Sequence, residues 1–144
     1  MIRELQAQDF ESLLQLYTHL HEKSVPESSP RRDALRDRIL SDPDYHIIVA
    51  EEDGRIVSSC VCVIVPNLTH DLRPYALIEN VVTHADYRGR GLATACLDYA
   101  KQIALRENCY KMMLMTGSKL ESTLRFYERA GYSSADKTAF NQWL

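Results

Sequence analysis

The feature that most constrains the fold is the segment Tyr87–Ala93, which reads YRGRGLA and separates two strongly patterned stretches. The stretch before it, Tyr75–Val82, is rich in aliphatic and β-branched residues and has the length of a largely buried strand. After it, apolar residues from Leu92 onward recur at steps of three and four, the spacing of one helix face. Gly89 and Gly91 are therefore predicted to lie where a helix begins.

A glycine-containing turn at the start of a helix is suited to binding an anion. The first amides of a helix lack intrahelical acceptors, and the helix dipole places partial positive charge at the same end. Glycines let an anion approach these amides closely, so a phosphate or pyrophosphate can be held by main chain, with Arg88 and Arg90 adding charge at the rim. A Walker loop is excluded because Leu92-Ala93 replaces its lysine and hydroxyl residue, and Thr94 breaks the dinucleotide fingerprint.

Three blocks of this chain resemble the GCN5-related N-acetyltransferase (GNAT) superfamily. The pattern Arg88-x-x-Gly91-x-Ala93 resembles the signature with which that family holds the pyrophosphate of acetyl-coenzyme A. Residues 78–87 are similar to its fourth strand and the link to the loop, and residues 124–132 (LRFYERAGY) are similar to its last helix. The resemblance covers roughly the C-terminal half and implies an acyltransferase with acetyl-coenzyme A as co-substrate.

The resemblance also implies a set of cofactor-binding residues. The family bulges or splays its fourth strand to receive the acetyl group and pantetheine, so the backbone at the corresponding valines is implied to contact them. One position departs from the family, because Leu120 stands where many relatives have an asparagine, and Ser118 or Lys119 is expected to substitute. The implied set is Val81, Val82, Thr83, Arg88, Gly89, Arg90, Gly91, Leu92, Ala93, Thr94 and Ser118.

Two residues are candidates for catalysis. Glu79 interrupts an apolar run, where an ionised carboxylate is costly unless it is paired or hydrogen-bonded. The resemblance implies that it is the general base, and the alternative is a structural ion pair or a solvent-facing side chain. Tyr127 matches the family's tyrosine, and a phenol with a pKa of ~10 can protonate a thiolate whose thiol has a pKa of ~8.5. Alternatively, Tyr127 packs beside Phe126.

Composition narrows the class of protein. A chain of 144 residues with 45% apolar and 26% charged residues predicts one globular domain, residues 1–144. No apolar stretch approaches the ~20 residues that cross a bilayer, and no signal-like apolar core follows Met1, so we expect a cytoplasmic protein without a membrane partner. A net charge of −3 disfavours nucleic acid as a partner.

The cysteines and histidines show no metal-ligand spacing, so no metal is expected. Cys60 and Cys62 would share one face of a strand, which favours packing of reduced thiols. In residues 30–40 the arginines either meet an acidic acceptor or form a solvated helix face with Asp33 and Asp37.

The pattern along the chain predicts a mixed α/β protein with the GNAT fold: a twisted mixed sheet flanked by about four helices. Asp-Gly at residues 53–54 indicates a hairpin, and the strand, helix, strand order across Glu79–Met115 predicts a right-handed crossover and a parallel pair. The expected strands are residues 2–5, 45–50, 56–65, 75–82, 111–115 and 137–140, and the expected helices are residues 9–20 (capped by Asp9), 30–40, 92–104 and 119–130.

These expectations combine into one function. The chain is predicted to transfer the acetyl group of acetyl-coenzyme A directly to a primary amine of a small molecule in a ternary complex. Ile78-Glu79 and residues 109–111 look like glucosamine-6-phosphate acetyltransferases, but Met115-Thr116 stands where those enzymes have an acidic residue. The alternatives are a protein or peptide amine as acceptor, or a non-catalytic acyl-coenzyme A sensor. The resemblance also implies a possible homodimer.

Overall fold

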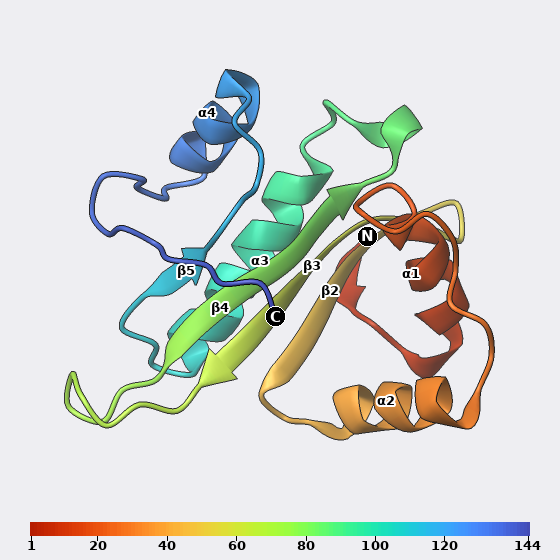
Figure 1. Cartoon of the computed structure of the whole chain (residues 1–144), viewed down its shortest axis with the longest axis horizontal. Helices are drawn as coiled ribbons and strands as arrows, with labels where there is room; N and C mark the ends of the chain where they lie inside the picture. Colours follow the sequence, from red (N-terminus) through yellow and green to blue (C-terminus); the bar gives the residue numbers. More distant parts are fainter.

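The computed structural model covers residues 1–144 and contains a five-stranded sheet with helices on both faces (Figure 1). None of the helices has both the length and the apolar character needed to span a bilayer. The elements, in chain order, are β1 Ile2–Glu4, the 3₁₀ helix η1 Ala7–Asp9, α1 Phe10–Tyr17, α2 Pro30–Ser41, β2 Tyr45–Glu52, β3 Arg55–Val65, β4 Tyr75–Thr83, the 3₁₀ helix η2 Ala85–Tyr87, α3 Leu92–Arg106, β5 Met112–Leu114 and α4 Glu121–Arg129.

The sheet has the mixed topology that the sequence predicts. Its strands lie in the order β1-β2-β3-β4-β5, and all neighbours are antiparallel except β4 and β5, which are parallel. Helix α3 connects this parallel pair. The order of elements from β1 to α4 therefore agrees with the prediction.

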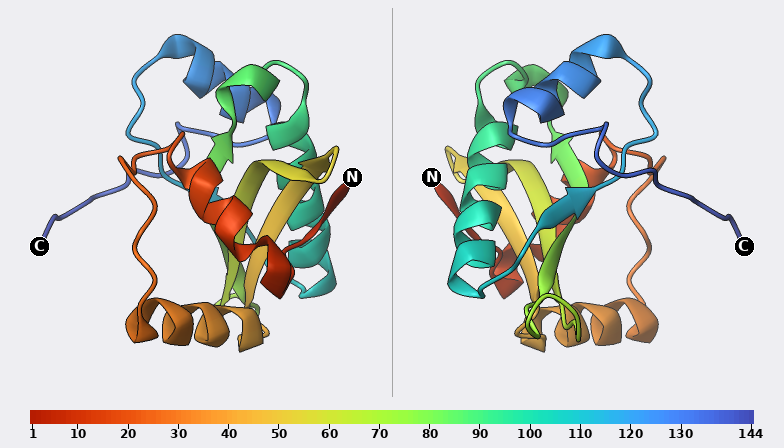
Figure 2. Two further views of the ribbon diagram at one scale, coloured as in Figure 1. Left: turned by 90° about the vertical axis from the view of Figure 1, so that its right-hand side faces the viewer. Right: turned by 90° about the vertical axis from the view of Figure 1, so that its left-hand side faces the viewer.

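The predicted last strand, residues 137–140, is wrong. These residues form no strand, because a strand needs a neighbouring ladder and the chain after α4 pairs with no edge of the sheet. In Figure 1 this tail crosses in front of β5 and β4, and Figure 2 shows it leaving the body of the protein. Phe140 and Trp143 are accordingly 90% and 92% exposed.

Two apolar layers fix the helices to the sheet. Helix α3 covers one face, whereas α1 and α2 lie on the opposite side (Figure 2). Cys60 and Cys62 both lie in the layer under α3, as the period of a strand predicts, and burial raises the pKa of both thiols. The layer under α1 contains Leu13, Leu16, Ile47, Val49, Ile56, Val61 and Val82.

Strand β4 contains a bulge that the sequence pattern does not reveal. Val61 of β3 pairs with Glu79, whereas Ser59 pairs with Val82, so Asn80 and Val81 together oppose one residue of β3. Asn80 adopts a positive φ of 50° to accommodate the extra residue. Because a bulge shifts the alternation of side chains, Val82 joins Glu79 on the side of α1.

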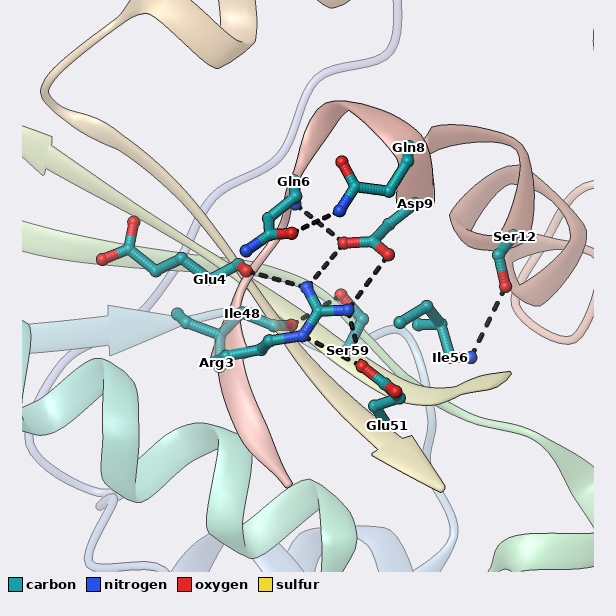
Figure 3. A network of polar contacts seen from close by, with 10 residues as sticks. All are labelled: Arg3, Glu4, Gln6, Gln8, Asp9, Ser12, Ile48, Glu51, Ile56 and Ser59. Carbon is teal, nitrogen blue, oxygen red and sulfur yellow. Dashed lines mark hydrogen bonds and ion pairs between the residues drawn. The ribbon is translucent and has the colours of Figure 1, made fainter. Parts of the chain in front are cut away.

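The N-terminal strand is tied to its surroundings by an arginine with two carboxylate partners (Figure 3). The Arg3 guanidinium donates to Asp9 Oδ2 at 2.6 Å and Oδ1 at 3.0 Å, and to Glu51 Oε2 at 2.7 Å. The Asp9 carboxylate also accepts from the Gln6 amide at 2.8 Å. The prediction that Asp9 caps the first helix with its side chain is therefore wrong, because Arg3 and η1 engage the carboxylate, and α1 ends at Tyr17 rather than residue 20.

This cluster predicts a pH-dependent contribution to stability. The hydrogen bond from Arg3 holds the pKa of Asp9 below its ordinary value, so the stabilisation is present above the unfolded-state pKa of ~3.9 and is lost as pH falls through the folded-state pKa. Asp9→Asn is expected to lower the free energy of unfolding at pH 7 by about 1–3 kcal/mol. Urea unfolding at pH 7 and pH 3 checks this. A deficit of equal size at both pH values, or the same deficit in the exposed control Asp136→Asn, would contradict it.

Candidate active site

The glycine turn that precedes α3 has the conformation that its sequence predicts. Gly91 is the N-cap of α3 and has a φ of 77°, and Gly89 has a φ of 75°. Such values favour glycine over residues that carry a Cβ. A Cβ at either glycine would lie more than 4 Å from every other part of the protein, so the space in front of the turn is open.

The amides of this turn have no acceptor within the protein. Arg88 N donates to Ala85 O at 3.5 Å and Ala95 N donates to Gly91 O at 2.9 Å, but the amides of residues 89–94 donate to no protein group. Leu92, Ala93 and Thr94 are the first residues of α3, where the helix dipole adds partial positive charge. The predicted anion-binding residues of the turn are thus brought together as consecutive main-chain donors.

The two arginines of the turn are held in different ways. Arg88 Nε donates to Thr83 O at 3.2 Å and has no carboxylate partner. Arg90 Nη1 lies 3.3 Å from Glu52 Oε2, and its guanidinium lies 4.8 Å from the centre of the Tyr87 ring. Glu52 therefore partly neutralises Arg90, whereas the charge of Arg88 is available to an anion.

The parallel strands β4 and β5 separate close to this turn. Their pairing ends at Ile78 and Leu114, but β4 continues to Thr83, so residues 79–83 have no partner on this edge. Val81, Val82 and Thr83, predicted to contact the cofactor, all lie in this unpaired part. Backbone groups here can bind a ligand without breaking the sheet, as the splayed strand of the resemblance implies.

Glu79 is the first residue of β4 that has no partner on the β5 side, and it lies on the face of the sheet that α1 covers. It pairs with Val61 in the sheet and is half-buried, and its carboxylate forms no ion pair or hydrogen bond with the protein. Burial and, to a lesser extent, the charge of Glu79 raise the pKa of Tyr45, which places this carboxylate near that phenol. The alternative of a structural ion pair is therefore wrong, because no cationic side chain of the protein pairs with this carboxylate.

Tyr127 approaches the sheet from the other side. It is half-buried, packs against the layer under α3, and its ring lies 5.0 Å from that of Phe126. Its hydroxyl has no hydrogen-bond partner in the protein, and burial raises its pKa, which keeps the phenol protonated. Helix α4 ends two residues later, at Arg129, with Gly131 at a φ of 98° and Tyr132 N donating to Tyr127 O at 3.0 Å.

Ser118 has a local structural contact. Its hydroxyl donates to Thr123 Oγ1 at 3.2 Å and accepts from Leu120 N at 3.3 Å, which orders the loop before α4. A cofactor contact through Ser118 would have to compete with these bonds. Leu120, at the position of the family's asparagine, is 69% exposed, and its aliphatic side chain cannot make the hydrogen bonds of an amide.

A pocket that the sequence does not indicate lies on the side of Glu79. It has a volume of about 380 Å³ and is enclosed by α1, α2, β2 and the bulge of β4. Tyr17, Tyr45 and Asn80 contribute polar groups to its wall. Asn80 was missed because it reaches this wall from the bulge of β4, which no local pattern predicts, and Tyr17 and Tyr45 because they meet it only through the packing of α1 on β2. No group of His, Cys, Asp or Glu is arranged to hold a metal ion.

Comparisons with known proteins agree with this geometry. The family model described as "Acetyltransferase (GNAT) family" matches residues 10–132. The chain is 31% identical over 137 residues to the glucosamine 6-phosphate N-acetyltransferase of Trypanosoma brucei brucei, covering 94% of this chain and 90% of that protein. It is 30% identical over 135 residues to an acetyltransferase of Yersinia pestis (strain Pestoides F), covering 94% and 89%. A solved structure of a putative acetyltransferase from Agrobacterium tumefaciens str. C58 is 39% identical and superimposes with a TM-score of 0.91 over 100% of this chain and 99% of that one.

Proposed function

The chain belongs to the GNAT family of acetyltransferases, and from this premise we propose that it transfers the acetyl group of acetyl-coenzyme A to a primary amine of a small molecule. Enzymes of the family use acetyl-coenzyme A, and the name of the trypanosomal relative concerns a small amine. The size of the pocket supports a small acceptor, since cavities of about 300–1,000 Å³ are typical of small-molecule sites.

One observation carries the proposal: the amides of residues 89–94 have no acceptor and follow β4, whose residues 79–83, Glu79 included, have no partner on the β5 side. In the proposed complex these amides and Arg88 bind the pyrophosphate. The pantetheine arm then follows the free edge of β4 along residues 81–83, with Ser118 and Thr94 at its border. The co-substrate supplies an activated thioester, so no acyl-enzyme is needed.

The proposed reaction assigns a proton to each catalytic group. The Glu79 carboxylate accepts a proton from the bound ammonium, directly or through a water, so that the free amine attacks the thioester carbonyl. Backbone donors near Val81 and Val82 stabilise the negative charge that develops on the carbonyl oxygen. The C–N bond forms, the C–S bond breaks, and the departing thiolate takes the phenol proton of Tyr127. The nitrogen of the product then loses its second proton, which restores the Tyr127 phenol, and Glu79 releases its proton to solvent. The approach of Glu79 and Tyr127 from opposite sides of β4 supports this division of roles.

The direct test is release of free thiol from acetyl-coenzyme A in the presence of a panel of amines. We expect acetyl-coenzyme A alone to raise the melting temperature and at least one amine to give turnover. Thermal stabilisation without turnover for any amine would favour a non-catalytic acyl-coenzyme A sensor. Glucosamine 6-phosphate belongs in the panel because of the relative's name, although Met115-Thr116 replaces the acidic residue of the enzymes with that substrate.

Tyr127→Phe tests the proposed acid. Removing the hydroxyl leaves the ring packed but withholds the proton from the thiolate, so kcat is expected to fall about 10²-fold with little change in KM for acetyl-coenzyme A. Steady-state kinetics measure both constants. Tyr110→Phe is the matched control, since Tyr110 stacks on His70 instead of packing under α4. An unchanged kcat in Tyr127→Phe would mean that this tyrosine only packs.

The homodimer and the cytoplasmic location remain predictions from the family resemblance and the composition. Light scattering on the eluting protein measures the first. Neither affects the chemistry proposed above, because every group assigned to it comes from one chain.

A further inference from the structure

We infer that the amine acceptor has an apolar body, an alkyl or arylalkyl chain, instead of the hydroxyl-rich ring of an amino sugar. The pocket is the one whose wall includes Asn80, the residue after Glu79 in β4, and the inference rests on the proposed function. It names the class of molecule that the pocket can hold, which the family membership leaves open.

The wall of the pocket is mostly aliphatic and aromatic. A hydroxyl-rich substrate needs several donors and acceptors around its ring, because each buried hydroxyl without a partner is costly. This wall instead offers surface that binds by excluding water. Its apolar side chains include Phe10, Leu13, Leu14, Leu35, Ile39 and Ile47.

The end of the wall that meets β4 carries uncharged polar side chains. Asn80 lies in the bulge next to Glu79, and Tyr17 and Tyr45 reach the pocket from α1 and β2. Burial raises the pKa of both phenols, so neither carries charge near neutral pH. This end suits an ammonium group that is about to lose a proton to Glu79, and it sets the direction in which the acceptor enters.

Two of the three arginines at the opposite end, Arg32 and Arg36, are already paired. Arg32 forms an ion pair with Glu11 and donates to Pro26 O at 2.7 Å. Arg36 Nε lies 2.9 Å from Asp37 Oδ1, and Arg36 Nη1 lies 3.4 Å from Asp33 Oδ1. A phosphate would have to compete with these carboxylates for the guanidinium groups, so the pocket favours an acceptor without an anionic group.

Two further charged residues at this end, Arg31 and Glu27, have opposite signs and form no ion pair. At the same end, Arg32 Nε is buried and has no hydrogen-bond partner in the protein. The far end of the acceptor can therefore carry one hydrogen-bond acceptor but does not need one.

The pocket also limits the length of the acceptor. It extends along α1 from Tyr17 to Phe10, the last and first residues of that helix. A helix of 8 residues is about 12 Å long. An extended amine of six or seven carbon atoms is of this order, whereas ethanolamine would leave most of the apolar wall uncovered.

The test is a series of straight-chain amines from n-propylamine to n-heptylamine, assayed by thiol release beside glucosamine and glucosamine 6-phosphate. Burial of each methylene predicts a rise in kcat/KM of about fourfold, with n-heptylamine at least about tenfold better than either sugar. A kcat/KM that does not change with chain length, or that is highest for glucosamine 6-phosphate, would overturn the inference.

A matched pair of variants locates the effect in the pocket. Leu35 is on α2, lines the pocket and is 52% exposed, whereas Leu105 is on α3, outside the pocket, and is 61% exposed. Leu35→Gln is expected to reduce the dependence of kcat/KM on chain length, and Leu105→Gln is expected to leave it as in the wild type. If kcat/KM depends on chain length equally in the wild type and in both variants, the apolar chain binds elsewhere and the assignment is overturned.

The outcomes separate this inference from the proposed function. If some amines react but chain length has no effect, the transferase proposal stands and the apolar acceptor is wrong. If acetyl-coenzyme A binds and no amine reacts, the transferase proposal fails, and thermal stabilisation in the presence of coenzyme A then decides the inference. Greater stabilisation by n-heptylamine than by n-propylamine, absent in Leu35→Gln, supports an apolar pocket, and equal stabilisation by both amines contradicts it.

Discussion

Glu79→Gln is expected to lower kcat at pH 7 by about 10²–10³-fold while acetyl-coenzyme A binds as in the wild type. The amide has nearly the shape of the carboxylate but cannot accept the proton of the acceptor ammonium. Because Glu79 has no ion-pair partner, the substitution leaves no cation of the protein unpaired, so the fold should be unaffected. Steady-state kinetics, with thermal shifts to confirm cofactor binding, measure the effect.

The pH dependence distinguishes loss of a base from loss of packing. An aliphatic amine with a pKa of ~10.4 is almost fully protonated at pH 7, so the rate of the variant should rise about tenfold per pH unit as the free amine becomes available. The wild type should show a smaller rise. Glu128→Gln, on the exposed surface of α4, is the control and should behave as the wild type. Wild-type kcat in Glu79→Gln would rule out its role as the base.

Gly91→Val is expected to weaken acetyl-coenzyme A binding by about 10²-fold or more. A β-branched residue at a φ of 77° is strained, and its side chain would enter the open space in front of the amides. Loss of two hydrogen bonds to a charged group, each contributing about 1.5–3 kcal/mol, accounts for an effect of this size. Isothermal titration with coenzyme A measures the dissociation constant.

Gly54→Val is the control that separates the backbone strain caused by Gly91→Val from its obstruction of the binding site. Gly54 has a φ of 74°, and a Cβ there also has open space around it, but it lies in the β2–β3 turn and contributes no amide to the loop. Both variants should lose similar stability, and only Gly91→Val should lose the cofactor. If the two proteins bind coenzyme A equally well, the turn before α3 is not the binding site.

Local patterns predicted much of the fold because each depends on neighbouring residues. Asp53 and Gly54 both have positive φ values, 49° and 74°, as a two-residue hairpin turn requires. The turn at Gly89 and Gly91 likewise follows from a strand, a glycine pair and a helix that are adjacent in the chain. Such features need no knowledge of distant contacts.

The bulge in β4 could not be predicted because it arises from pairing between strands. Nothing in the residues at 80 and 81 marks an irregularity, and only the register of β4 against β3 reveals the extra residue. The consequence for the site is large, because the bulge brings Asn80 into the pocket next to Glu79. Without the bulge, the side chains of residues 81–83 would each point to the opposite face of the sheet.

The cluster around Arg3 shows the same limit at longer range. Arg3 and Glu51 are 48 residues apart in the chain. From the sequence, Asp9 is predicted to be an ordinary helix cap, but in the structure its carboxylate accepts hydrogen bonds from Arg3 and Gln6. The strand predicted at residues 137–140 is wrong for a related reason: a segment with strand-like residues forms a strand only if it pairs with an edge of the sheet, and this one does not.

A crystal structure of the protein with coenzyme A tests the central claim most directly. We expect diphosphate oxygens within hydrogen-bond distance of several main-chain nitrogens of residues 89–94, and a pantetheine arm that runs along the unpaired edge of β4 toward Glu79. A diphosphate bound elsewhere, with those amides facing only solvent or protein, would contradict it.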